Sequence, residues 1–198
     1  MPLFLTPYQL LNTRTHFDEN SAFFVVLARN DKDVSKAVQF AANHNLALSI
    51  YGTGHEFQDR NAGLAPNGLL IRTICLRDVS VDKNQMNVFN HPDGTIRLGS
   101  GMTWGTSIYG FTGVHEIAAE NERVVVSGHA AEVGIVGWSL GGGHSPLGPI
   151  YGLGVDQILE VEMVGPDGSY ITANDNGTTI LSSGKLQGAP NVSTKGRL

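Results

Sequence analysis

Two glycine-rich segments of this chain have residue types suited to binding phosphate oxygens. The first is Gly52-Thr53-Gly54-His55, which directly follows a short apolar run. The second lies between Gly128 and Gly154 and contains nine of the 25 glycines in the 198 residues. Successive amide groups without side chains in the way form a concave nest for anionic oxygens. We therefore expect two phosphate-binding loops, with His55 beside the first.

The second segment also fits a different chemistry. Residues 137–141 match G-x-S-x-G, the nucleophile elbow of hydrolases, with Ser139 as the nucleophile. The elbow needs a histidine base well downstream, whereas the only histidine after Ser139 is His144, five residues later. The spacing favours the phosphate site, and a serine hydrolase using Ser139 stays as an alternative function.

Other motifs lack a residue that their chemistry needs. Residues 99–105 resemble a dinucleotide fingerprint, but the third glycine is one place late and the segment follows a hairpin pattern. Residues 137–142 have P-loop spacing without the lysine and the hydroxyl residue that should follow. Neither His55-Glu56 nor His115-Glu116 has a second histidine at helical spacing, so we expect no metal site.

The composition excludes further classes of function. The net charge is −5, which argues against nucleic acid as a partner because such proteins carry a basic patch. No apolar run approaches the roughly 18 residues of a membrane span, so we expect no membrane partner. The N-terminus shows no signal-peptide pattern and assigns no compartment. Cys75 is the single cysteine and has no internal disulfide partner.

The first glycine segment must be positioned by the elements before it. Residues 23–27 form an apolar run typical of a buried strand, and residues 47–50 form a second one. Between them, Asn30 or Asp31 offers an N-cap, and apolar residues at helical spacing predict a helix to about His44. With a third strand at 69–71, this pattern predicts a parallel βαβ unit whose second strand leads into Gly52.

The pattern changes in the second half of the chain. Residues 86–89 and 95–98 predict a hairpin around a turn at 91–94, and residues 158–164 and 170–173 predict another. A short helix is expected over 103–111 and a strand over 124–126. We therefore expect an α+β protein of two lobes, with a seam near residues 79–83. Residues 175–198 have little apolar surface and are expected to form a flexible tail.

Four stretches together resemble a known family. They are residues 48–55, 98–105, 133–144 and 151–161. The sequence resembles the FAD-binding domain of the vanillyl-alcohol oxidase / p-cresol methylhydroxylase (PCMH) type, and within it the berberine-bridge-enzyme-like FAD-linked oxidoreductases. The resemblance implies a two-lobe PCMH-type domain over residues 20–174, with a small parallel lobe at about 20–80. The second lobe, at about 83–174, would hold an antiparallel sheet with flanking helices.

The resemblance also implies which residues bind the cofactor. Gly52, Thr53 and Gly54 would bind the pyrophosphate through their amides, and His55 falls where many family members attach the 8α-methyl of FAD. Five residues would line the isoalloxazine and ribityl side: Gly128, Val133, Gly134, Gly137 and Trp138. Tyr151, Gly152 and Val161 would lie by the phosphates and the adenine. Tyr51, Gly101 and Gly141 complete the expected cofactor-binding set, and no catalytic base is assigned.

The implied reaction is the oxidation of an alcohol, sugar or similar small substrate by hydride transfer to FAD, with O₂ as the acceptor. Two departures from the family pattern bear on it. Bicovalent members have a cysteine where this chain has Ala130, so no cysteinyl link is expected. Nothing after Asn174 resembles a substrate domain, so a catalytically inactive flavin-binding fragment is the first alternative. Related proteins are often secreted, but the substrate and the compartment are not assigned.

Overall fold

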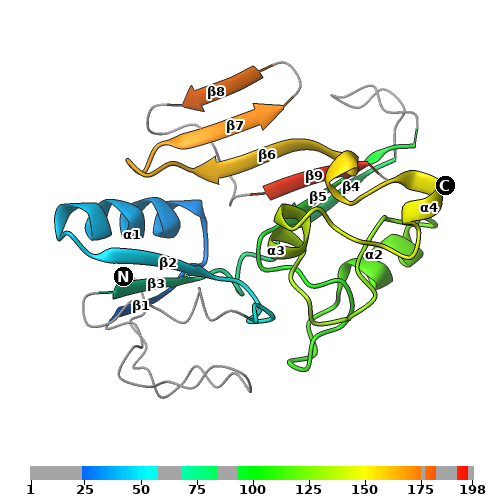
Figure 1. Cartoon of the computed structure of the whole chain (residues 1–198), viewed down its shortest axis with the longest axis horizontal. Helices are drawn as coiled ribbons and strands as arrows, with labels where there is room; N and C mark the ends of the chain where they lie inside the picture. Colours follow the sequence, from blue (N-terminus) through cyan, green and yellow to red (C-terminus); the bar gives the residue numbers. More distant parts are fainter. Residues whose placement is uncertain (1–23, 58–67, 84–92, 175–176, 182–190, 196–198) are drawn as a thin grey trace.

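The protein is built around two β-sheets that lie side by side (Figure 1). A computed structural model describes residues 24–57, 68–83, 93–174, 177–181 and 191–195, the last two ranges as backbone only. One sheet is parallel with three strands, and the other is antiparallel with six. The chain is therefore a mixed α/β protein with one parallel and one antiparallel sheet, as the resemblance implies.

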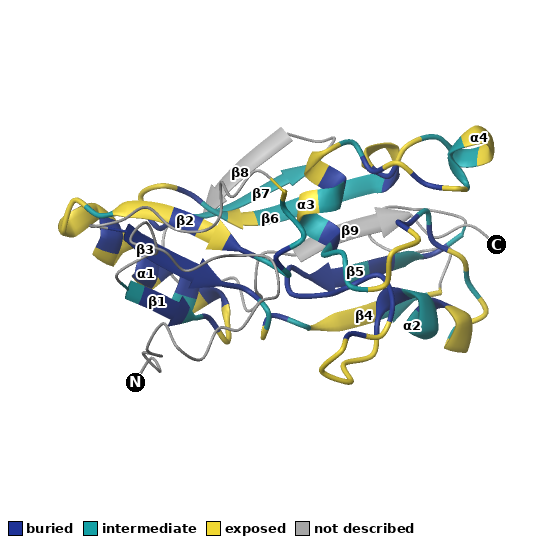
Figure 2. Ribbon diagram, turned by 60° about the horizontal axis from the view of Figure 1, so that its bottom comes forward, coloured by how far each residue is buried: buried dark blue, intermediate teal, exposed yellow. Residues whose placement is uncertain are grey.

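The parallel lobe is the predicted βαβ unit. Its elements are β1 (Phe24–Leu27), α1 (Asp31–Asn43), β2 (Ala47–Tyr51) and β3 (Gly68–Arg72). The strand order is β1-β3-β2, and both pairings are parallel. All residues of β3 are buried, and Figure 2 shows this strand in the interior. The three carboxyl ends meet at one edge, where ligands of parallel sheets usually bind.

Helix α1 begins as its sequence predicts and lies between the two sheets. The Asn30 side chain caps it by accepting a 2.9 Å hydrogen bond from the Asp33 amide. Its apolar face packs on Leu69 and Ile71 of the parallel sheet. On the other side, the Ser35 hydroxyl donates a 2.7 Å hydrogen bond to the Gly168 carbonyl, in the turn of the second sheet. The helix therefore fixes one lobe against the other.

The antiparallel lobe surrounds a second core. Its strand order is β4-β5-β9-β6-β7-β8. The strands are β4 (Val79–Asp82), β5 (Thr95–Gly99), β6 (Ile158–Val164), β7 (Tyr170–Asn174), β8 (Gly177–Leu181) and β9 (Asn191–Lys195). Short helices join them: α2 (Val114–Glu120), α3 (Ile135–Leu140), α4 (Gly148–Tyr151) and the 3₁₀ helix η2 (Val155–Gln157). Leu98, Met102, Trp104 and Ile135 belong to its buried core.

The hairpins are partly as predicted. The β6–β7 hairpin is confirmed, with Val164 paired to Tyr170 across the turn. The partner of β5 is different: Val79–Asp82 pairs with it, whereas residues 86–89 were expected to. Residues 84–92 lie outside the described residues. The expected seam at 79–83 is therefore occupied by a strand of the antiparallel sheet, and the change of lobe comes before β4.

Two expected elements between β5 and α3 are absent from the described residues. No helix forms over 103–111, because this backbone bonds to other segments: Trp104 N–H donates to Val133 O, and Val114 N–H donates to Thr103 O. No strand forms over 124–126, although Val125 is buried in the core. Both segments are irregular, and their apolar residues are divided between the core, as for Trp104 and Val125, and the surface, as for Ile108 and Val124.

The segment after residue 174 also differs from its prediction. It contains β8 and β9, and β9 lies between β5 and β6 at the centre of the sheet. A strand is held by backbone hydrogen bonds, which polar residues supply as well as apolar ones. Composition therefore gave no sign of it. Within the part of the chain that the structure describes, no helix is long and apolar enough to cross a membrane.

Candidate functional site

The first glycine segment lies at the carboxyl edge of the parallel sheet. Residues 52–57 follow the last residue of β2 without forming a regular element. Gly54 has φ +86°, a left-handed conformation that side chains rarely adopt. A Cβ at Gly52 would meet only Thr73 Oγ1, at 3.9 Å, so the backbone there is open to a ligand. His55 follows and is half-buried.

A hydrogen bond joins this segment to the second glycine segment. The Gly134 amide donates to Thr53 Oγ1 at 2.9 Å, across 81 residues of sequence. Gly134 is the N-cap residue of α3, and the next amide, that of Ile135, donates to Met102 O at 3.2 Å. The two predicted phosphate loops therefore come together in space, one from each lobe.

Several amides at this junction have no acceptor within the protein. Among the described residues, the amides of Gly52, Thr53 and His55 donate no hydrogen bond, and neither do those of Val136 and Gly137. All five residues are half-buried or exposed, so a ligand can reach them. Free amides from two segments in contact are able to donate to an anion with several oxygens. This is the strongest ligand-binding feature of the described structure.

The other glycines of the second segment have a packing reason. A Cβ at Gly128 would lie 2.9 Å from Nε1 of Trp138, and one at Gly143 would lie 2.6 Å from Cζ3 of the same indole. Gly154 is as close to this ring. By contrast, a Cβ at Gly137 would meet nothing within 4 Å. The Trp138 indole thus leaves no room for a side chain at positions 128, 143 and 154. A side chain at position 137 would point into open space.

Trp138 is fixed by contacts on several sides. Its Nε1 donates to His144 O at 3.2 Å, and its ring lies edge-on to Trp104, with centroids 4.7 Å apart. The Trp104 ring also stacks on His115, whose Nε2 is 2.8 Å from Ser127 Oγ. These contacts place Gly128, Val133, Gly134, Gly137 and Trp138 in one region. The predicted isoalloxazine side is thus one connected part of the fold.

The remaining predicted contacts are more dispersed. Gly101 is buried, and a Cβ there would clash with the Thr73 and Ile74 backbone, so packing explains this glycine. Gly141 ends α3 and is exposed. Tyr151 O accepts from Gln157 Nε2 at 2.7 Å.

Two more predicted contacts lie toward the antiparallel sheet. Gly152, with φ +84°, packs on Asp156. Val161 lies in β6, paired with Ala173 and Val192. No described hydrogen bond joins Gly152 or Val161 to residues 52–55.

Tyr51 ends β2 in a buried position. The Arg72 guanidinium lies over the Tyr51 ring, 4.2 Å from its centroid. Burial lowers the pKa of Arg72 from its ordinary value, and the neighbouring Tyr51 partly offsets this effect. Tyr51 is 3% exposed, so its side chain lies in the protein interior and supports residues 52–55 from that side.

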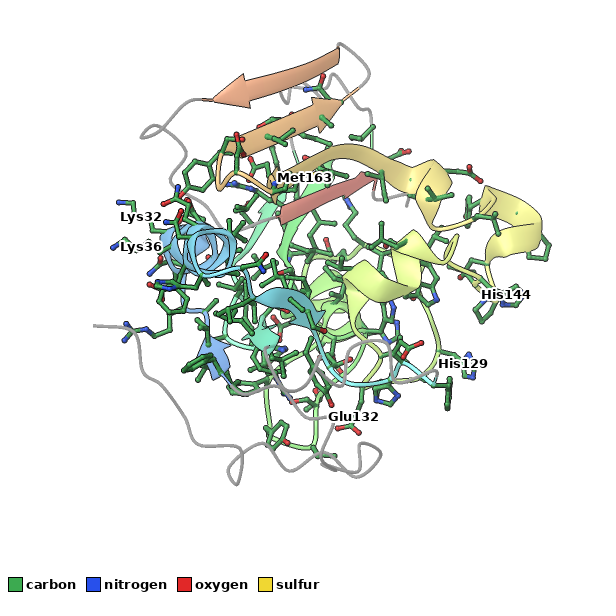
Figure 3. The ribbon with its side chains drawn as sticks, turned by 60° about the vertical axis from the view of Figure 1, so that its left-hand side comes forward. Lys32, Lys36, His129, Glu132, His144 and Met163 are labelled. Atoms are coloured by element: carbon green, nitrogen blue, oxygen red, sulfur yellow. The ribbon has the colours of Figure 1, made fainter. Side chains whose placement is uncertain are left out.

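The alternative chemistries find little support in the geometry. Ser139 is the fifth residue of α3 and is 7% exposed, whereas a nucleophile elbow places its serine at an exposed turn between strand and helix. His144 and His129 are both exposed and lie at the periphery in Figure 3. Among the described residues, no group of three or more His, Cys, Asp or Glu could hold a metal ion.

Sequence reasoning missed a residue that holds this region together. The Arg77 guanidinium donates to Gly101 O at 2.6 Å and to Thr112 O at 2.9 Å. A shallow hollow lined by Val81 and Ala118, among others, lies away from the glycine segments. Arg77 belongs to no recognisable sequence motif, so only its tertiary contacts reveal its role.

Comparisons with known proteins identify the family of the chain. The family described as FAD binding domain matches residues 22–174. A FAD-linked oxidoreductase of Aspergillus flavipes is 35% identical over 152 residues, which is 76% of this chain and 24% of that protein. One from Claviceps purpurea is 34% identical over 164 residues, which is 80% of this chain and 32% of that protein. The chain thus spans about a quarter of the length of the first relative and about a third of the second.

Solved structures share the fold. A VAO-type flavoprotein of Myceliophthora thermophila has a TM-score of 0.73 at 25% identity, over 90% of this chain and 32% of that one. A glucooligosaccharide oxidase of Acremonium strictum, which carries a 6-S-cysteinyl, 8α-N1-histidyl FAD, has a TM-score of 0.70 at 19% identity. The match covers 89% of this chain and 35% of that one. The chain therefore belongs to the FAD binding domain family, is similar to FAD-linked oxidoreductases over that domain, and has the fold of the VAO-type and BBE-like flavoproteins.

Proposed function

We propose that this chain binds FAD with its pyrophosphate on the amides of residues 52–55 and its flavin side toward the start of α3. The observation that carries the proposal is the set of amides without protein acceptors; at two of these residues, Gly52 and Gly137, a Cβ would meet no atom closer than 3.9 Å. A pyrophosphate presents several anionic oxygens and can use amides from both segments. The Thr53–Gly134 hydrogen bond keeps these amides on facing segments.

We propose His55 as the point of covalent attachment. It lies two residues after Thr53 and is half-buried, so a cofactor bound on the amides of Gly52 and Thr53 would lie close to it. The glucooligosaccharide oxidase with this fold has a histidyl link to its FAD. At His55 a ring nitrogen would lose its proton, and a C–N bond would replace a C–H bond of the 8α-methyl. The two electrons released would pass to O₂. A cysteinyl link has no partner, because position 130 is alanine and Cys75 is exposed elsewhere.

The reaction we propose is the oxidation of an alcohol, sugar or similar small substrate. When bound, FAD supplies the hydride acceptor for such a reaction, and the protein supplies orientation and electrostatics. In this chain, the residues of the two glycine segments bind and orient the cofactor. Substrate binding and proton removal would need groups that the described residues do not identify.

An alternative is a protein that binds flavin without turnover. It rests on the same free amides, which account for binding a cofactor but assign no group that would remove a proton from a substrate. Binding would then be intact, because the matched residues 22–174 include both glycine segments. The two readings differ only in whether the bound flavin is reduced by a substrate.

One experiment tests the binding and the attachment. The 198-residue chain is produced with FAD, and the absorbance of flavin is recorded on native protein and on acid-precipitated protein. We expect flavin in both samples for the wild type, and in the native sample alone for His55→Ala. Native wild-type protein without flavin would disprove FAD binding. Flavin that washes out of acid-precipitated wild type would disprove covalent attachment and leave the binding proposal standing.

The same preparations separate turnover from silent binding. Anaerobic mixing with a panel of sugars and primary alcohols should bleach the flavin absorbance if this chain completes a substrate site. Absorbance that stays unchanged across the panel, in protein that retains its flavin, supports the binding fragment. Ester hydrolysis that is lost in Ser139→Ala would instead support the serine hydrolase.

A further inference from the structure

Arg77 connects the two lobes beside the glycine segments. It follows β3 of the parallel lobe, and its guanidinium donates to Gly101 O at 2.6 Å and to Thr112 O at 2.9 Å, both in the antiparallel lobe. A third, longer contact of 3.4 Å reaches Thr103 Oγ1. The guanidinium also lies over the Phe111 ring, 4.8 Å from its centroid. Among the described residues it forms no ion pair with a carboxylate.

The segment that Arg77 holds also carries the start of α3. Residues 101–105 run alongside residues 131–135: Gly105 N–H donates to Ala131 O at 2.8 Å, and Trp104 N–H donates to Val133 O at 3.2 Å. Ile135 N–H donates to Met102 O at 3.2 Å. Any shift of residues 101–105 therefore moves Gly134 and the free amides of Val136 and Gly137.

Among the contacts between the lobes, two side-chain hydrogen-bond sets lie next to the segments that carry the free amides. The first is the Thr53–Gly134 hydrogen bond, which lies within the site. We propose that Arg77, which makes the second set, is a positioning residue that holds the α3 amides at the right separation from residues 52–55 to bind one pyrophosphate-containing ligand. This inference rests on the proposed FAD binding. The role that it gives to Arg77 is exerted through residues 101–105 and needs no contact with the ligand.

The chemistry of the contacts requires arginine. A planar guanidinium donates in two directions at once and stacks on an aromatic ring, whereas a lysine ammonium acts as a single point charge. Gly101 O and Thr112 O are both carbonyl acceptors, and they belong to different turns of the chain. Arg77→Lys therefore keeps the charge and loses the simultaneous contact, which separates positioning from electrostatic attraction.

The test uses the full 198-residue chain and two measurements. FAD affinity is measured by fluorescence quenching for wild type, Arg77→Lys, Arg77→Ala and the control Arg97→Gln. Hydrogen exchange is measured by mass spectrometry on each protein without ligand. Arg97 is a suitable control because it forms an ion pair with Glu162 of the same antiparallel sheet, away from the glycine segments.

We expect both Arg77 variants to bind FAD roughly tenfold or more weakly, since charge-assisted hydrogen bonds are lost. Exchange should become faster in residues 101–105 and 131–137 and stay unchanged in β1 and α1. Arg97→Gln should leave FAD affinity and exchange in both segments unchanged. The Arg77→Lys variant keeps the test valid if Arg77→Ala fails to fold.

The outcomes separate this inference from the proposed function. Wild type that does not bind FAD overturns both. Wild type that binds FAD, with Arg77→Lys binding equally well, overturns the positioning role and leaves FAD binding intact. Weaker binding by Arg77→Lys without faster exchange in residues 131–137 also overturns the positioning role, because affinity would then fall while the α3 amides stay held as in the wild type.

Discussion

At the scale of single residues, the glycines of the second segment divide into two groups. Gly128, Gly143 and Gly154 are held to glycine by the Trp138 indole, whereas Gly137 faces open space. The sequence marks all of them equally as a glycine cluster. The difference matters because packing explains the first group, whereas packing does not require glycine at position 137, where we propose that the ligand lies.

A pair of alanine substitutions tests this division. Gly137→Ala should fold with unchanged or slightly higher stability, because alanine gains about 0.5–1 kcal/mol over glycine in a helix. It should nevertheless weaken FAD binding, since the added methyl occupies the open space. Gly154→Ala should lower stability by roughly 1–3 kcal/mol, because overpacking forces the indole to move.

Thermal unfolding and FAD titration measure both effects. The division would be contradicted if Gly137→Ala lost stability while keeping its affinity. It would equally be contradicted if Gly154→Ala left the melting temperature unchanged.

At the scale of elements, the loops of the antiparallel lobe are held by caps and cross-connections. Glu116, in the first turn of α2, accepts hydrogen bonds from the amides of Thr106 at 3.2 Å and Gly113 at 3.1 Å. Burial alone would raise the pKa of this carboxyl, but these hydrogen bonds outweigh burial and lower it. Thr106 lies in the segment where a helix was expected. Its amide donates to the Glu116 carboxylate of α2 instead of to a carbonyl of its own segment.

This cap predicts a pH dependence. A carboxyl whose pKa is lowered by folding contributes stability above its unfolded pKa, and that contribution is lost as the pH falls through the folded value. We therefore expect Glu116→Gln to be less stable than wild type at pH 7, by roughly 1 kcal/mol for a lost cap. The difference should shrink as the pH is lowered below about 4.5, the ordinary value for this group.

Thermal melts of both proteins between pH 7 and pH 3 give the comparison. Glu120→Gln, at the exposed end of the same helix, is the matched control and should show no such trend. A stability difference that is constant with pH would show that Glu116 does not act through its charge.

At the scale of the whole molecule, the antiparallel sheet depends on a strand from the end of the chain. β9 pairs with β5 on one side and with β6 on the other. Val192 is opposite Leu98 in β5 and Val161 in β6. Without β9, the strands on either side of it would each leave a row of backbone groups unpaired, including those of the predicted contact Val161.

Val192→Pro tests this central position. Proline removes one backbone donor and disfavours the middle of a sheet. A loss of roughly 3 kcal/mol would lower the melting temperature of a chain of this size by about 6–12 °C. Circular dichroism melts provide the measurement, with Thr179→Pro in the edge strand β8 as the control. Equal effects of the two substitutions would contradict the central placement of β9.

The sequence alone determined the features that depend on neighbours along the chain. The βαβ unit, the Asn30 cap and the β6–β7 hairpin follow from periodicity and turn residues, because their hydrogen bonds and apolar faces repeat over a few positions. The resemblance, which rests on four ordered stretches, identified the family. It also predicted both glycine segments as parts of one site.

Only the tertiary structure decided which distant segments meet. The Thr53–Gly134 and Arg77–Gly101 hydrogen bonds join residues 81 and 24 positions apart. Residues 103–111 are not helical because their partners lie in other segments, and β9 enters the sheet despite its polar composition. Such pairings depend on where each lobe places its free backbone groups. The local sequence pattern does not predict these positions. The glycine-rich sequence predicts amides that could bind an anion. The contacts between the lobes decide which of these amides have no acceptor within the protein.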